Sequence, residues 1–154
     1  MAQTAAVKPG PVERPSLTLT RRFRARPEKV WAAWTDPEKL IAWFCTTKTK
    51  PGSMRAELDV RAGGRYRVSF DMESGEHSEV GGVYREVVPN EKLVFSWAWH
   101  STPERESLVT VSIKPDGAGA LMVFTHEQFF DEAARDNHAK GWDELFAQLE
   151  KVLV

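Results

Sequence analysis

Cysteine is almost absent from this sequence, and its scarcity excludes two classes of protein. Cys45 is the only cysteine in 154 residues. No disulfide can therefore form within the chain, and no site built from several cysteines can hold a metal. A single thiol fits a reducing compartment, so we expect a cytoplasmic protein. No basic residue adjoins Cys45 in the sequence, and we interpret it as an inert, partly buried thiol.

Long apolar runs and an excess of one charge are missing as well. No segment is long and apolar enough to span a bilayer, and the first residues lack the apolar core of a signal peptide. Lys plus Arg is 21 and Asp plus Glu is 22, which gives a net charge of −1. Nucleic-acid binders need a surplus of positive charge to neutralise phosphates. We interpret the basic run at 21–26 as partly a solvated strand face. The sequence predicts no membrane insertion and no nucleic-acid partner.

Short motifs of the common enzyme classes are also lacking. The sequence has no Gly-x-Ser-x-Gly elbow, phosphate-binding loop, dinucleotide fingerprint or His-Glu-x-x-His pair. Asp71, Glu73, His77 and Glu79 gather around an expected hairpin tip, where a solvated turn explains them better than a metal site does. We predict no cofactor and no metal.

The clearest pattern that is present is an amphipathic helix at 131–153. Its apolar positions recur at i, i+3, i+4 and i+7, as expected for a helix with one buried face. They are Ala134, His138, Trp142, Leu145, Phe146, Leu149, Val152 and Leu153. Asp131 is a suitable N-cap residue. Gly141 is costly in the middle of a helix, and we expect the sheet or a ligand to approach the backbone there.

The rest of the chain predicts strands and two short helices. Alternating apolar and polar residues predict strands at 17–25, 54–60, 65–72, 77–88, 92–100, 108–114 and 121–129. Pro27 and Pro37 each suit the first turn of a helix, so helices are expected at 27–34 and 37–44. Gly81 and Gly82 predict a bulge or sharp bend. The order predicts an α+β domain at 16–154, in which a curved antiparallel sheet of about six to seven strands wraps around the last helix, preceded by an arm at 1–15.

Four groups of residues carry a resemblance to a known family. They are Val30-Trp31 with TDPE at 35–38 and Trp43; DVRAGGRY at 59–66; GVYREVVP at 82–89 with Lys92 and Leu93; and Gly141-Trp142 with Leu145 and Leu149. The chain resembles the AHSA-type branch of the START-like (SRPBCC) superfamily, named for activators of a heat-shock chaperone ATPase. The resemblance implies a helix-grip fold with a cavity between the sheet and the long helix. Eukaryotic co-chaperones of this branch carry a separate N-terminal domain, whereas the first expected strand here follows only about fifteen residues. We therefore do not expect chaperone binding, and we leave a homodimer open.

The aromatic residues expected on the inner face form the candidate site. The chain has six Trp and eight Phe, and ligand sites are mostly apolar with a few placed polar groups. We predict a pocket at the first half of the last helix, lined from Trp31, Tyr66, Phe70, Trp97, Trp99, Phe124, His126, His138 and Trp142. The preferred function is non-enzymatic binding of a small hydrophobic or aromatic molecule. The alternatives are a cyclase or aromatase that uses the two histidines as acid–base groups, and a co-chaperone-type interaction module.

Overall fold

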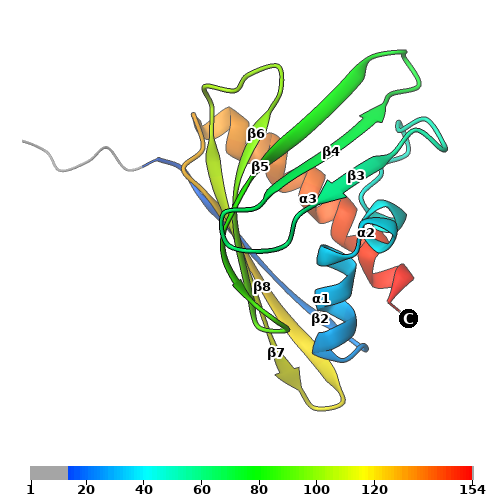
Figure 1. Ribbon diagram of the computed structural model, residues 1–154, viewed down its shortest axis with the longest axis vertical. Coiled ribbons are helices and arrows are strands. Elements are labelled where there is room, and N and C mark those ends of the chain that lie inside the picture. Colours follow the sequence, from blue (N-terminus) through cyan, green and yellow to red (C-terminus); the bar gives the residue numbers. More distant parts are fainter. Residues whose placement is uncertain (1–13, 154) are drawn as a thin grey trace, which may run out of the picture.

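The computed structural model describes residues 14–153 and confirms the expected α+β class (Figure 1). Its elements in chain order are β2 (Leu17–Phe23), α1 (Pro27–Thr35), α2 (Pro37–Trp43), β3 (Arg55–Leu58), β4 (Arg65–Asp71), β5 (His77–Val88), β6 (Lys92–Trp99), β7 (Ser107–Asp116), β8 (Gly119–Glu127) and α3 (Glu132–Val152). Of the predicted N-terminal arm, residues 1–13 lie outside the described residues. The final residue, 154, lies outside them as well.

The sheet has seven strands in the order β2-β8-β7-β6-β5-β4-β3. Strands β3 to β8 follow one another as an antiparallel meander, and β2 closes the far side by pairing with β8. The sheet curves around α3, which crosses its concave face diagonally (Figure 1). An antiparallel sheet with one apolar face needs such a cover. The expected helix-grip arrangement is therefore confirmed.

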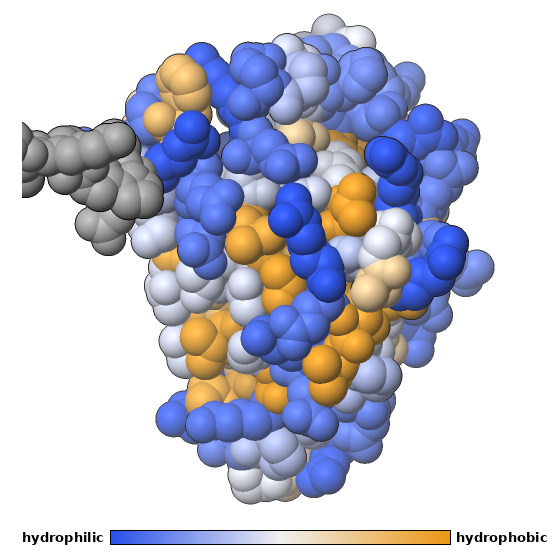
Figure 2. Space-filling view, turned by 60° about the vertical axis from the view of Figure 1, so that its left-hand side comes forward, coloured by the Kyte–Doolittle hydropathy of each residue, from blue (hydrophilic) through white to orange (hydrophobic). Residues whose placement is uncertain are grey.

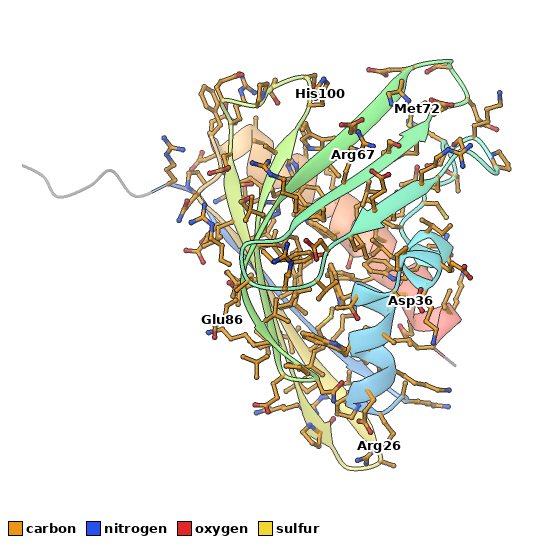
Figure 3. The ribbon with its side chains drawn as sticks, viewed as in Figure 1. Arg26, Asp36, Arg67, Met72, Glu86 and His100 are labelled. Atoms are coloured by element: carbon orange, nitrogen blue, oxygen red, sulfur yellow. The ribbon has the colours of Figure 1, made fainter. Side chains whose placement is uncertain are left out.

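Local sequence explains the two short helices. Pro27 and Pro37 occupy the first turns of α1 and α2, where a missing N–H costs nothing. Asp36 separates the two helices, and its carboxylate accepts a hydrogen bond from the backbone N–H of Glu38 at 3.0 Å. Figure 3 shows Asp36 at this junction. Helix α1 lies against β7 and β8, and α2 lies against β3 and α3.

Helix α3 begins and packs as its sequence indicates. The Asp131 carboxylate accepts a hydrogen bond from the Ala134 N–H at 2.8 Å, which makes it the N-cap. The buried residues of α3 are Trp142, Leu145, Phe146 and Leu149. Val152, expected on the same face, is 47% exposed, whereas the adjacent Leu153 packs against the core. Arg21 of β2 bonds Asp143 at 2.9 Å and Glu150 at 3.3 Å, which ties the solvent side of α3 to the sheet.

The sheet bends sharply where β5 passes β6. The regular pairing stops between Gly81 and Tyr84, and the register shifts between Tyr84 and Glu86. In the gap the Ser96 hydroxyl accepts the Val83 N–H at 2.9 Å and so replaces a ladder bond. A Cβ added to Gly82 would lie 2.1 Å from the Ser96 carbonyl oxygen. Only glycine permits this approach, so the predicted bend lies at Gly82 and the bulge itself falls a few residues later.

The interior between the sheet and the helices is filled by aromatic rings. The Trp34 ring lies 4.9 Å from that of Trp43, and the Phe124 ring lies 4.6 Å from that of Trp142. A narrow space of about 20 Å³ remains in this interior and is lined in part by Trp34 and Tyr66. That volume holds roughly one water molecule. The Trp34 Nε1–H has no hydrogen-bond partner among the described residues.

Candidate functional site

A groove opens between the first half of α3 and the end of β6. It has a volume of about 280 Å³. Its lining residues are Trp97, Trp99, Asn137, His138, Gly141, Trp142 and Leu145. Gly141 belongs to this lining, and no protein atom lies within 4 Å of a Cβ added to it. The expected close approach of the sheet to Gly141 is therefore wrong, because the groove itself lies there.

His138 joins α3 to both indoles of β6. Its Nδ1 lies 2.7 Å from the carbonyl oxygen of Ala134. A carbonyl oxygen can only accept, so Nδ1 carries the proton. Its Nε2 accepts the indole N–H of Trp99 at 3.0 Å and that of Trp97 at 3.4 Å. His138 is therefore a neutral imidazole in the Nδ1–H form, with its acceptor nitrogen already in use.

His126 occupies a second, deeper position and has the opposite tautomer. Its Nδ1 accepts the Trp142 indole N–H at 3.0 Å, so the ring proton is on Nε2. From there it donates to the Ser107 hydroxyl oxygen at 2.7 Å. Ser107 in turn donates to the Trp97 carbonyl oxygen at 3.2 Å. His126 is completely buried, and every polar atom of its ring has a partner.

Burial holds both histidines in the neutral state. Burial, with a smaller contribution from His138, whose ring lies 5.3 Å away, lowers the pKa of His126 to about 2. Burial also lowers the pKa of His138, against an opposing effect of its bond to Ala134. A charged imidazole would lose its hydration and the indole bonds together. At neutral pH the groove is therefore bounded by neutral groups.

A second space lies on the other side of His138. It has about 180 Å³ and shares Trp97, Trp99, Asn137 and His138 with the groove. Gln128, which follows β8 and precedes the residues that border this space, has a left-handed backbone conformation with φ of 66°. Phe129 turns inward as a result, while Phe130 remains 53% exposed. The Arg105 guanidinium lies 4.0 Å from the centre of the Phe130 ring, and this cation–π contact links the two loops that border the space.

The predicted site residues separate into two groups. Those that line the groove are Trp97, Trp99, His138 and Trp142. His126 supports the groove from behind, through Trp142. Phe124 is buried in the aromatic core, and Tyr66 donates to the Ser96 carbonyl oxygen at 2.6 Å. Phe70 reaches only the outer edge of Trp99, and Trp31 of α1 lines neither space.

Three residues that line these spaces, Ser107, Asn137 and Phe129, were not among the predicted site residues. Ser107 alternates with Val109 and Val111 along β7, so extending that pattern by one step would have placed it on the inner face. Asn137 adjoins His138 in the sequence. Phe129 could not have been found, because its inward direction depends on the unusual backbone of Gln128.

The largest hollow is on the opposite face of the sheet. It has about 710 Å³ and lies over the glycines of β5. Figure 3 shows Arg67 on β4 and His100 beyond β6 at its two sides. Its walls carry ion pairs, such as Arg67–Glu57 at 2.6 Å. Figure 2 shows how apolar and polar side chains alternate in patches over the face that it brings forward.

Residues 14–153 contain no group of three or more His, Cys, Asp or Glu side chains that could hold a metal ion. At the hairpin tip, His77 Nδ1 lies 2.7 Å from Asp71 as an exposed pair. Among the described helices, none combines the length and apolar character that crossing a bilayer requires.

A sheet that grips one long C-terminal helix defines the START-like class, and the comparisons agree with this assignment. Residues 24–154 match the family model described as Activator of Hsp90 ATPase homolog 1-like protein. The chain belongs to this family. No curated protein is significantly similar to it in sequence.

Solved structures from several bacteria share the fold. A protein from Rhodobacter sphaeroides is 25% identical, with a TM-score of 0.78 over 95% of each chain. Protein CV1439 from Chromobacterium violaceum is 26% identical, with a TM-score of 0.75 over 90% of this chain and 97% of that one. CalU16 from Micromonospora echinospora, at 24% identity and a TM-score of 0.68 over 90% of this chain and 75% of that one, is similar in fold.

Proposed function

We propose that this protein binds a small hydrophobic or aromatic molecule, without transforming it, in the groove between α3 and β6. The observation that carries the proposal is the groove lining, in which three tryptophans surround a glycine that leaves the helix backbone bare. Flat rings give large contact areas at low conformational cost. The single thiol, Cys45, supports a reducing, cytoplasmic setting for this role.

The groove is preferred over the larger hollow because of its chemistry. Ligand sites in proteins are mostly apolar with few polar groups, and the groove contributes only Asn137 and His138 as polar residues. The hollow on the outer face is lined by several charged residues, and Arg67 is paired there with Glu57. A hydrophobic molecule would desolvate these charges without compensation.

A cyclase-like activity has less support. A general base needs a free acceptor nitrogen within reach of the substrate. His126 Nδ1 is occupied by Trp142, and its Nε2 already carries a proton, so it cannot activate Ser107 despite their 2.7 Å separation. His138 Nε2 is occupied by Trp99. Catalysis would require both networks to rearrange.

A co-chaperone-type role is the second candidate, and the family description favours it. An interaction module would use an exterior face, and the charged outer hollow is the surface that would suit a protein partner. Stimulation of a chaperone ATPase by the purified chain, abolished by Arg67→Glu and retained in Gly141→Leu, would support this role over ligand binding.

The groove is tested by filling it. Gly141→Leu adds a side chain where no protein atom lies within 4 Å of the new Cβ, so the helix can accept it. We expect this variant to bind the neutral fluorescent probe phenylnaphthylamine at least about tenfold more weakly, since overlap with a ligand costs on the order of 1–3 kcal/mol. Gly141→Ala should retain binding.

Ala147→Leu is the matched control, because Ala147 is on the exposed side of α3. It adds the same side chain away from the groove and should leave probe affinity unchanged. Equal affinity of the wild type and Gly141→Leu would refute the proposal. Absence of probe binding to the wild type would do so as well.

A further inference from the structure

One acceptor on His138 serves two donors. A neutral imidazole has a single acceptor lone pair, which lies on Nε2 here because Nδ1 carries the proton. Trp99 takes it at 3.0 Å, within the normal range for a hydrogen bond. Trp97 approaches the same atom at 3.4 Å, beyond that range. The Trp97 N–H is therefore a buried donor with only a weak partner.

Two acceptors in the same network as Trp97 are already engaged. The Ser107 oxygen accepts from His126 and donates to the Trp97 carbonyl. His126 Nδ1 accepts from Trp142. Trp97 itself is 5% exposed and lines both the groove and the second space. Buried N–H groups are nearly always paired, so this one is poised for an acceptor supplied from outside the chain.

We infer that the ligand of the groove is a neutral aromatic molecule bearing a carbonyl-type oxygen, which accepts the Trp97 indole N–H. The inference rests on the proposed binding function and names the chemistry of its ligand. A hydroxyl oxygen could also accept this N–H, but its own proton would then need an acceptor, and the His138 lone pair is already taken. A carboxylate would find no cation in the groove, since Arg105 lines only the second space, where it stacks on Phe130.

The test compares acetylnaphthalene with isopropenylnaphthalene, which has the same shape but a methylene group in place of the oxygen. Binding to the full chain is followed by calorimetry. We expect the ketone to bind roughly two- to tenfold more tightly, as one net hydrogen bond provides. Trp97→Phe, which keeps a ring but removes the N–H, should abolish this preference and still bind the hydrocarbon. Trp31→Phe makes the same change on α1, away from the groove, and should preserve the preference.

The possible failures are distinct. If both probes bind the wild type equally, the inference is wrong while the binding function stands. If neither binds, both are wrong. Tighter binding of naphthoate than of the ketone would overturn the assignment of a neutral ligand. Should Trp97→Phe fail to fold, infrared spectroscopy of the wild-type complex decides, because a bonded carbonyl absorbs at lower frequency than the same ketone in hexane. An unshifted band would overturn the inference.

Discussion

His126 should make the protein progressively less stable in acid. Its pKa is lowered to about 2 in the folded protein, whereas an unfolded histidine has a pKa of about 6.5. Above pH 6.5 both states carry a neutral ring, and stability does not depend on this group. Below about pH 6.5 the unfolded state binds a proton at His126 and the folded state does not, so the free energy of unfolding decreases as the pH is lowered.

The magnitude follows from the size of this interval. Each pH unit between the two pKa values costs about 1.4 kcal/mol. Lowering the pH from about 6.5 to about 5 should therefore cost about 2 kcal/mol through His126 alone. His138, whose pKa is also lowered, acts in the same direction. This loss is a substantial part of the roughly 5–15 kcal/mol that stabilises an ordinary domain.

Urea unfolding at a series of pH values provides the assay. The slope of unfolding free energy against pH should be smaller in His126→Gln than in the wild type by about 1.4 kcal/mol per unit below pH 6.5. His100→Gln is the control, because the His100 side chain is 82% exposed, and its slope should match the wild type. Equal slopes in all three proteins, or an NMR titration of His126 near its unfolded pKa, would refute the reasoning.

Two further predictions concern the scaffold. Gly82→Ala should lower the free energy of unfolding by about 1–3 kcal/mol, because its Cβ would overlap the Ser96 carbonyl. Gly141→Ala should raise it by up to about 1 kcal/mol. In thermal melts, a higher Tm for Gly82→Ala would contradict the first assignment, and a lower Tm for Gly141→Ala would contradict the second. Asp131→Ala should lower the free energy of unfolding by about 1 kcal/mol through loss of the N-cap of α3. Asp131→Asn, which can still accept the cap hydrogen bond, should keep most of that stability in chemical unfolding. Equal losses in the two variants would show that the cap bond contributes nothing.

The periodic parts of the fold could be predicted from the sequence because each period reports one local geometry. The stripe of α3 correctly placed Trp142, Leu145 and Leu149 on the buried face. Alternation along β6 correctly placed Trp97 and Trp99 on the inner face with the helix. The prediction for Val152 was wrong: it is exposed while the adjacent Leu153 packs against the core, a choice between neighbouring positions that the helical period does not decide.

The site could be predicted only in part, because it depends on register and tautomer. The sequence assigned His126 and His138 to the same pocket, and their rings are 5.3 Å apart. It could not indicate that three indole N–H groups would occupy their acceptor nitrogens. Those contacts depend on how β6, β8 and α3 align, which is a tertiary property. Tyr66 was expected to line the ligand pocket. Its hydroxyl instead donates a hydrogen bond to the Ser96 carbonyl oxygen, a contact that also depends on tertiary structure.

The uncharged lining of the groove also bears on how a ligand would be released. None of its residues carries a formal charge at neutral pH, since the pKa of His138 is lowered. Ionic strength acts by screening charges, so salt should leave the occupancy of the groove nearly unchanged. Delivery of the cargo would then depend on partition into a more apolar acceptor, such as a lipid phase or the site of another protein.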